Sequence, residues 1–216
     1  VRTQALSENA FFDESLGDPH TEEILIVGGE DHKTGQADDA EERYDKPTLH
    51  KTDGVPVAIN IGDYLVGWGY RLLARDASAH GAEAASDLLA RFSDAHVKLA
   101  EGQGAELLWR QAADQSLSAL DALRIYALKT SPAFEAALYA GVRLGGEAEQ
   151  VAKLDKTIAE FSKNLGIAFQ IINDLNDFIP DEDNKLVAGQ DVLAARPTLL
   201  LALALETLPA QKGQEL

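Results

Sequence analysis

Apolar and polar residues follow a helical period along most of the chain from Val55 onward. Apolar side chains recur three, four and seven residues apart, a spacing that gathers them on one face of a helix. Before Val55 no such period is sustained, and glycines at positions 28, 29 and 35 interrupt the chain. The pattern predicts helices over Val55–Arg75, Glu83–Arg110, Leu117–Leu128, Ala133–Leu144, Glu147–Phe178 and Thr198–Leu208.

Prolines mark where two of these helices are expected to begin or end. Ser131 followed by Pro132 has the form of a helix N-cap with proline in the first helical position, which predicts a break at Lys129–Thr130. Pro180 stops the long helix that precedes it.

A short apolar run within Glu22–Gly28 fits either a strand or a helical turn, and no second run of alternating β-branched residues follows it. The sequence therefore predicts an all-α fold.

The helix over Val55–Arg75 has the length of a membrane span, but its polar residues argue against one. Asn60, Asp63 and Arg71 lie within it, and charged groups inside a membrane are costly. The segment is more typical of a helix buried in a large α-helical bundle. We therefore predict that the chain has no integral membrane span.

Composition and charge narrow the possible partners. The 216 residues are 45% hydrophobic and 25% charged, as in ordinary globular proteins, and the formal net charge is −17. Such an acidic surface disfavours nucleic acid, so an anionic substrate would have to be met by metal ions or by a local basic cluster. The absence of cysteine excludes disulfides, thiolate zinc sites and cysteine nucleophiles. No secretory signal is visible, and we predict a cytoplasmic location.

The first fifty residues are more acidic than the rest. They hold thirteen acidic residues against four basic ones, a net charge of −9. We therefore expect two regions, an acidic N-terminal segment over residues 1–35 and an all-α domain over residues 36–216.

A polar arc near the end of the helix Glu147–Phe178 is the sharpest candidate site. At 100° per residue, one 100° arc of this helix holds Gln170, Asn173, Asp174 and Asp177. Two carboxylates and two amides one turn apart suit a hard cation such as Mg²⁺, which takes oxygen ligands and keeps several waters. The alternative is a solvated polar stripe on a bundle helix.

Other candidate groups are less specific when each is taken alone. The acidic run Asp38–Glu42 fits a solvated loop, or part of a site for several Mg²⁺ ions around a diphosphate if a second carboxylate cluster faces it. Lys129 and Thr130 could reach an anion, or the lysine could complement the dipole at a helix end. Gln103 and Glu106 share one face of a long helix.

Several short motifs follow one another along the chain in a recognisable order. They are Lys46-Pro-Thr-Leu-His50, Gly54-x-x-x-Ala58-x-x-x-Gly62-Asp63-x-Leu65, Gly102-Gln103-x-x-Glu106-Leu107, Lys129-Thr130, Phe169-Gln170-x-x-Asn173-Asp174-x-x-Asp177, and Lys185 with Gly189-x-Asp191. In this order they resemble the trans-polyprenyl diphosphate synthases. The resemblance runs from about Asp38 to Leu208, and a match of several motifs in order is specific.

The resemblance implies an isoprenoid-synthase-type helical bundle, in which two Asp-rich motifs face each other across a central cavity. Mg²⁺ held by both motifs draws off the diphosphate of an allylic substrate, and isopentenyl diphosphate attacks the resulting cation before a proton is lost. The implied function is that of a Mg²⁺-dependent prenyltransferase that makes a linear isoprenyl diphosphate. The resemblance also implies a homodimer paired through long bundle helices.

Carried over by position, the family's motifs imply roles for residues of this chain. The implied catalytic residues are Lys129, Thr130 and Gln170. The implied diphosphate-binding residues are Arg43, Lys129, Thr130, Gln170 and Lys185. The implied Mg²⁺ ligands are Asp38, Asp39 and Glu42 in the first motif, and Asp174 and Asp177 in the second.

Both Asp-rich motifs depart from the family pattern. The second motif begins with Asn173 where the family has aspartate, and an amide oxygen can ligate Mg²⁺ without adding charge. Counting back from Arg43 without a gap puts Thr34 and Gly35 at the leading aspartates of the first motif. A deletion of about four residues would instead make Asp38-Asp39-x-x-Glu42 the motif, the register that we slightly prefer because an acidic run can bind metal.

The front of the family's domain has no counterpart in this sequence. Nothing in Val1–Gly35 matches the Gly-Lys-x-x-Arg-Pro segment that helps to bind isopentenyl diphosphate, so we expect the N-terminal helices to be truncated. Two alternatives to a synthase therefore stay open. One is a terpene synthase on the same fold, and the other is a catalytically inactive subunit of a heteromeric prenyl synthase.

Overall fold

The structure, a computed structural model, divides into two compact units, Val1–Leu72 and Leu73–Leu216. It describes residues 42–43, 46–75, 77–113, 115–146, 148–179 and 189–207. The predicted acidic segment 1–35 and the apolar run within Glu22–Gly28 lie outside the described residues. The predicted region boundary at residue 35 therefore stays a prediction, and we describe each unit by itself.

The first unit contributes a short strand pair and two helices to the described residues. Strand β1, Glu42–Arg43, pairs antiparallel with β2, Lys46–Pro47. Helix α2, Leu49–Thr52, is followed by Gly54 at φ +87°, a left-handed conformation that glycine adopts without a Cβ clash. Helix α3 then spans Val55–Arg75, the range that the sequence predicts, and its last three residues belong to the second unit.

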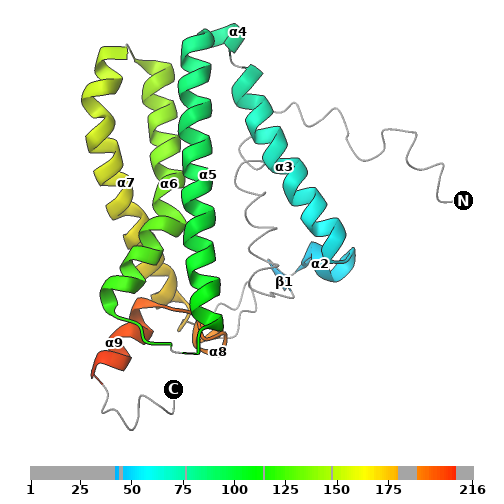
Figure 1. The fold of residues 1–216 in the computed structure, drawn as a ribbon, viewed down its shortest axis with the longest axis vertical. Helices are drawn as coiled ribbons and strands as arrows, with labels where there is room; N and C mark the ends of the chain where they lie inside the picture. Colours follow the sequence, from blue (N-terminus) through cyan, green and yellow to red (C-terminus); the bar gives the residue numbers. More distant parts are fainter. Residues whose placement is uncertain are drawn as a thin grey trace, which may run out of the picture. The chain divides into compact units, whose positions relative to one another are not determined.

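The second unit is built on three long antiparallel helices (Figure 1). Helix α4, Ala77–His80, leads into α5, Ala82–Gln111, which is followed by α6, Ala119–Gly145, and α7, Ala148–Asn176. Helix α6 packs between α5 and α7. Helices α8, Gln190–Leu193, and α9, Leu199–Thr207, lie where α5 ends and α6 begins, and α9 packs against α6 and α7. We call this the lower end of the unit.

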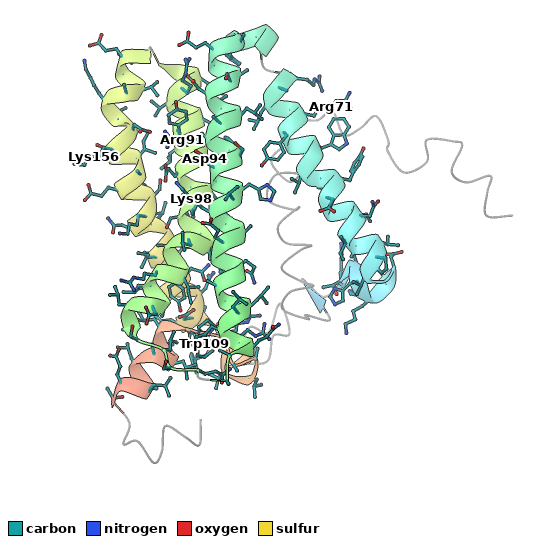
Figure 2. All side chains as sticks on the ribbon, in the orientation of Figure 1. Arg71, Arg91, Asp94, Lys98, Trp109 and Lys156 are labelled. Carbon is teal, nitrogen blue, oxygen red and sulfur yellow. The ribbon has the colours of Figure 1, made fainter. Side chains whose placement is uncertain are left out.

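Each end of the three-helix unit has its own apolar cluster. The upper cluster joins Leu88 of α5, Tyr139 of α6 and Val151 of α7. The lower cluster consists of Leu117, Ala122 and Ala202, with Trp109 packed against it near the end of α5 (Figure 2). The buried apolar surface therefore holds α5, α6 and α7 together at the top and fixes α9 at the bottom.

The predicted helix break at Lys129–Thr130 is wrong. Pro132 lies inside the continuous helix α6, and Ser131 is a buried helical residue rather than an N-cap. A proline inside a helix removes one backbone hydrogen bond and crowds the preceding turn, so it ends most helices. In this chain, packing from both neighbouring helices keeps α6 helical.

Two glycines allow the neighbouring helices to approach α6 at this proline. A Cβ on Gly102 of α5 would lie 2.5 Å from the backbone nitrogen of Lys129, and a Cβ on Gly166 of α7 would lie 2.7 Å from that of Ser131. Neither distance leaves room for a side chain, so glycine fits both positions where a larger residue does not. The close approach of both helices is the physical reason that the sequence-based break does not occur.

The all-α prediction is confirmed, and the described strands are only the two-residue β1 and β2. Helices α5, α7 and α9 begin and end within two residues of the predicted ranges. Among the residues that the structure describes, no helix combines the length and the apolar character that crossing a membrane requires, α3 included.

Candidate functional site

The lower end of the second unit brings together polar residues that the sequence singles out on α6 and α7. Thr130 follows Lys129 on α6, and Gln170 lies one turn before Asp174 on α7. The amide Nε2 of Gln170 donates a hydrogen bond to Thr130 Oγ1 at 2.6 Å. Two side chains forty positions apart, both predicted to contact a diphosphate, are therefore in direct contact.

Lys129 is held by a carboxylate on α5. Its Nζ lies 2.7 Å from Glu106 Oε2, and the Glu106 side chain is only 5% exposed. Because Lys129 lies well inside α6, the alternative that it complements the dipole at a helix end is excluded. The second oxygen of Glu106, Oε1, and the amide Nε2 of Gln103 have no hydrogen-bond partner among the described residues. Buried polar atoms are normally satisfied, so these two atoms are suited to contact a bound polar group.

Asp174 is buried and held by a tyrosine on α6. Its carboxylate accepts a hydrogen bond from the hydroxyl of Tyr126, which in turn accepts one from the backbone N–H of Leu199 at 2.7 Å. Asp174 is 5% exposed, whereas Asn173 beside it is exposed. The alternative of a solvated stripe therefore does not describe Asp174.

Asp177 connects the end of α7 to α8. Its Oδ2 accepts a hydrogen bond from the backbone N–H of Asp191 at 3.0 Å, and its backbone carbonyl accepts one from Gly189 at 2.7 Å. The Asp191 carboxylate is paired with Arg196 at 2.7 Å. These bonds bring a third aspartate, Asp191, close to Asp174 and Asp177.

Among the described side chains that interact at the lower end, the acidic groups outnumber the basic ones. We call the carboxylates of Glu106, Asp174, Asp177 and Asp191 the carboxylate cluster, and the basic groups that act on it are Lys129 and Arg196.

Burial and mutual repulsion shift the titration of this cluster. Burial raises the pKa of Asp174 to about 6, and Asp191 adds to the rise while the hydrogen bond from Tyr126 opposes it. Burial also raises the pKa of Asp191, although the charge of Arg196 opposes the rise. Burial and the bond to Asp174 raise the pKa of Tyr126, which keeps its hydroxyl protonated as a donor. Shifted pKa values of this kind gather at functional sites.

The oxygen donors of the cluster fit Mg²⁺ only in combination with another ligand. Among the described residues, no three acidic or histidine side chains are grouped so that they could hold a metal by themselves. Mg²⁺ is commonly bound through one or two carboxylates together with phosphate oxygens and waters. Asp174 and Asp177 suit that role, because an ionised carboxylate has two oxygens and more lone pairs than one hydrogen bond uses.

Five predicted site residues cannot be placed. Asp38, Asp39 and Lys185 lie outside the described residues, and Glu42 and Arg43 are described only through the backbone of β1. Their roles, and the register of the first Asp-rich motif, stay predictions.

Sequence reasoning missed two residues of the lower end. Tyr126 belongs to no motif, and Arg196 lies in an irregular segment between α8 and α9. The spacing offered one signal, because Tyr126 precedes Lys129 by three positions and Thr130 by four and so shares their face of a helix. Glu106 and Asp191 lie within two of the motifs that resemble the family's, but neither residue is assigned a role from the sequence.

The whole helical part of the chain resembles one protein family. Residues 37–216 match the family model described as polyprenyl synthetase. The chain is 30% identical over 171 residues to the short chain isoprenyl diphosphate synthase of Methanothermobacter thermautotrophicus, covering 78% of this chain and 50% of that protein. It is 34% identical over 174 residues to the geranylgeranyl diphosphate synthase of Cereibacter sphaeroides, covering 78% of this chain and 54% of that protein.

A solved structure extends the similarity to the fold. The geranylgeranyl pyrophosphate synthetase of Pyrococcus horikoshii aligns with a TM-score of 0.78 and 29% identity, covering 91% of this chain and 58% of that one. The chain spans about half the length of the curated relatives that it matches.

Proposed function

Because the chain belongs to the polyprenyl synthetase family, we propose that it acts as a Mg²⁺-dependent trans-prenyltransferase. Its substrates are isopentenyl diphosphate and an allylic diphosphate, and its product is a linear isoprenyl diphosphate. One observation carries the proposal: Lys129, Thr130 and Gln170 lie at the same end of the unit as the carboxylates of Asp174 and Asp177.

This arrangement suits an anion that arrives with cations. The carboxylate cluster repels a diphosphate alone, but it attracts a diphosphate whose charge is partly neutralised by Mg²⁺. Bound Mg²⁺ supplies Lewis-acid activation of the diphosphate as a leaving group. Asp174 and Asp177 are the described residues that would hold it.

The protein's own donors bind and orient the diphosphate. Lys129 supplies a positive charge, and on binding it exchanges the carboxylate of Glu106 for a diphosphate oxygen. Thr130 and Gln170 already bond to each other, so their hydroxyl and amide are held in one place and present donors to the same anion. Glu106 and Asp174 are buried, and a buried setting that excludes water protects a reactive cation.

The remaining predicted residues enter the proposal from the family resemblance. Arg43 and Lys185 bind the allylic diphosphate, and Asp38, Asp39 and Glu42 supply the metal ligands of the first motif. The structure describes none of their side chains, so these roles rest on the family resemblance.

The test is incubation with labelled isopentenyl diphosphate and each allylic diphosphate in turn, with and without Mg²⁺. A Mg²⁺-dependent, longer isoprenyl diphosphate supports the proposal. Hydrocarbon products would replace it with a terpene synthase. Absence of any product, with intact folding by circular dichroism, would replace it with a non-catalytic subunit.

Assembly and location complete the proposal. We expect a homodimer, because the long helix α3 exposes large apolar side chains such as Val57, Ile59 and Tyr64 among the described residues. A monodisperse monomer by light scattering at micromolar concentration would contradict this. A cytoplasmic location remains a prediction from the sequence.

A further inference from the structure

Tyr126 links the carboxylate cluster to the first turn of α9. Its side chain is buried, with the residue 4% exposed. The hydroxyl donates its single proton to Asp174 Oδ2 and accepts the backbone N–H of Leu199 at 2.7 Å. One hydroxyl therefore bonds simultaneously to a side chain of α7 and to the backbone of α9.

The bond to Leu199 meets a structural need of α9. The first N–H groups of a helix have no partner within the helix and require one outside it. Thr198 accepts the N–H of Leu201 at 3.1 Å, and Tyr126 takes that of Leu199. Thr198 and Tyr126 therefore both cap the start of α9, and Tyr126 also bonds to Asp174.

We propose that Tyr126 is a positioning residue that orients Asp174 for cation binding and transmits that binding to the first turn of α9. The inference rests on the proposed function, since it takes Asp174 as a ligand of a Mg²⁺–diphosphate complex. With Oδ2 held by the hydroxyl, the rotation of the carboxylate is restricted, and its remaining lone pairs point in a limited set of directions. Outer partners that fix a ligand in this way strengthen metal binding.

A purely structural role for Tyr126 makes different predictions. If the hydroxyl served only to cap α9, its removal would lower the stability of the protein and leave ligand binding unchanged. If it positions Asp174, its removal weakens binding of the complex and also uncouples α9 from that binding. The two roles are therefore separated by a binding measurement together with a local probe of α9.

The variant Tyr126→Phe removes the hydroxyl and keeps the buried ring. Its matched control is Tyr139→Phe, which removes a hydroxyl from another buried tyrosine of the same helix, far from the cluster and next to Arg91. Calorimetry measures the binding of Mg²⁺ with inorganic diphosphate to the full 216-residue chain. We expect Tyr126→Phe to weaken binding by about tenfold, the lower end of the range for loss of an outer partner. Tyr139→Phe should bind as the unaltered chain does.

Amide hydrogen exchange supplies a readout independent of activity. In the unaltered chain, loading with Mg²⁺ and inorganic diphosphate should slow exchange at Leu199 and in the rest of the first turn of α9. In Tyr126→Phe the same loading should leave exchange in that turn unchanged. Equal affinity and equal protection in the two proteins would overturn the inference.

A second pair of variants cuts the link from its other end, in case Tyr126→Phe does not fold. Leu199→Pro removes the donated N–H at the first position of α9, where proline is well tolerated, and Leu199→Ala shortens the side chain but keeps the N–H. Weaker binding in Leu199→Pro than in Leu199→Ala supports the inference, and equal binding overturns it.

If the unaltered chain itself fails to bind Mg²⁺ with diphosphate, the proposed function fails together with the inference. If it binds but the variants match their controls, the inference alone fails.

Discussion

Two polar clusters connect the same three helices, and they differ in how deeply their charged groups are buried and how fully they are paired. In the upper one, Arg91 of α5 lies 2.7 Å from Glu135 of α6 and 2.5 Å from Asp155 of α7. Its guanidinium carbon also lies 4.3 Å from the centre of the Tyr139 ring. Figure 2 shows Arg91 along α5 well above Trp109. We call this group the arginine cluster.

The carboxylate cluster at the lower end connects the same helices through more deeply buried acids, Glu106 and Asp174 among them. Lys129 pairs with Glu106 and Arg196 with Asp191, and Glu106 has an oxygen without a partner among the described residues. The pKa values of Asp174 and Asp191 are raised there. In the arginine cluster, by contrast, each side chain has its partner, and Asp155 is half exposed to solvent.

The two clusters therefore differ in burial and pairing: one has a partner for each side chain, and the other holds an unpartnered buried oxygen and carboxylates of raised pKa. The arginine cluster joins three helices through one guanidinium, which bonds to both of its carboxylates, and one of these is half exposed to solvent. The carboxylate cluster is unfavourable as it stands, because buried like charges repel and lose hydration. Added positive charge would therefore stabilise the lower end, and the proposed Mg²⁺ would supply it.

The largest effect is expected from removing a charge of the carboxylate cluster. Asp174→Asn should reduce the affinity for Mg²⁺ with inorganic diphosphate by on the order of 100-fold. Loss of a residue that only supports a metal ligand typically costs about 10- to 100-fold in affinity, and this variant removes the charge of the proposed ligand itself. The variant without metal should be no less stable at pH 7, since a neutral amide avoids the desolvation of the buried carboxylate. Calorimetry and urea unfolding measure the two quantities.

The matched change in the arginine cluster should have the opposite signature. Glu135→Gln removes a carboxylate of which 18% of the side chain is exposed, and it lies on the same helix as Lys129. We expect about 1 kcal/mol lower stability from the weakened bond to Arg91, with unchanged binding of the diphosphate complex. If both variants lose binding equally, the two clusters do not differ in the way described.

The next effect concerns the packing that supports the lower end. Gly166→Ala would place a Cβ 2.7 Å from the backbone nitrogen of Ser131, so α7 must move away from α6. We expect a loss of about 2 to 3 kcal/mol in the free energy of unfolding. The bond between Gln170 and Thr130, close to this contact, should weaken with it, and affinity for the diphosphate complex should fall.

Gly141→Ala is the control for the higher helix propensity of alanine relative to glycine. Gly141 lies on α6, and a Cβ added there would meet no atom within 4 Å, so Gly141→Ala should raise stability by up to about 1 kcal/mol. Urea unfolding compares the two variants. A Gly166→Ala protein as stable as Gly141→Ala would show that close approach of α7 is not required.

Sequence periodicity predicted most of the helices because their apolar faces obey the spacing of an α-helix. It failed at Pro132 because the contacts that keep α6 helical come from Gly102 and Gly166, which are distant in the sequence. No local pattern reports that kind of packing. The fold was therefore readable from the sequence except where a long-range contact overrides a local signal.

The same distinction explains the site. The arc of Gln170 and Asp174 was predictable, since helix geometry alone puts them on one face. The pair Lys129–Glu106 depends on how α5 and α6 are aligned, which their separate sequences do not specify. Tyr126 resembles a core residue in any pattern of polarity, and only its bonds to Asp174 and Leu199 distinguish it.

A smaller effect is expected at the ion pair that balances part of the cluster. Lys129→Gln removes a cation and leaves Glu106 buried without it, so stability should fall by about 1 to 2 kcal/mol. Affinity for the diphosphate complex should fall by about tenfold, equivalent to 1.4 kcal/mol. Calorimetry and thermal unfolding measure both.

A double variant separates these two contributions. Replacing Glu106 with glutamine in the Lys129→Gln protein removes the stranded carboxylate, so stability should recover while affinity stays low. Recovery of both would mean that Lys129 affects binding only by keeping the protein folded. Recovery of neither would mean that Glu106 itself helps to hold the diphosphate complex.

The smallest effect is the pH dependence of the metal-free protein. The pKa of Asp174 is raised to about 6 in the folded state, against about 3.9 in an unfolded chain. Between pH 7 and pH 5 the folded state therefore takes up a proton that the unfolded state does not, so stability rises as the pH falls. Asp174 alone should contribute about 1 kcal/mol over this interval, and the raised pKa of Asp191 acts in the same direction.

Urea unfolding in the presence of a chelator at pH 7 and pH 5 measures this gain in stability. The gain in stability between pH 7 and pH 5 should be smaller by Asp174's contribution in Asp174→Asn and unchanged in Glu135→Gln. An equal gain in both variants would place the titrating groups outside the carboxylate cluster.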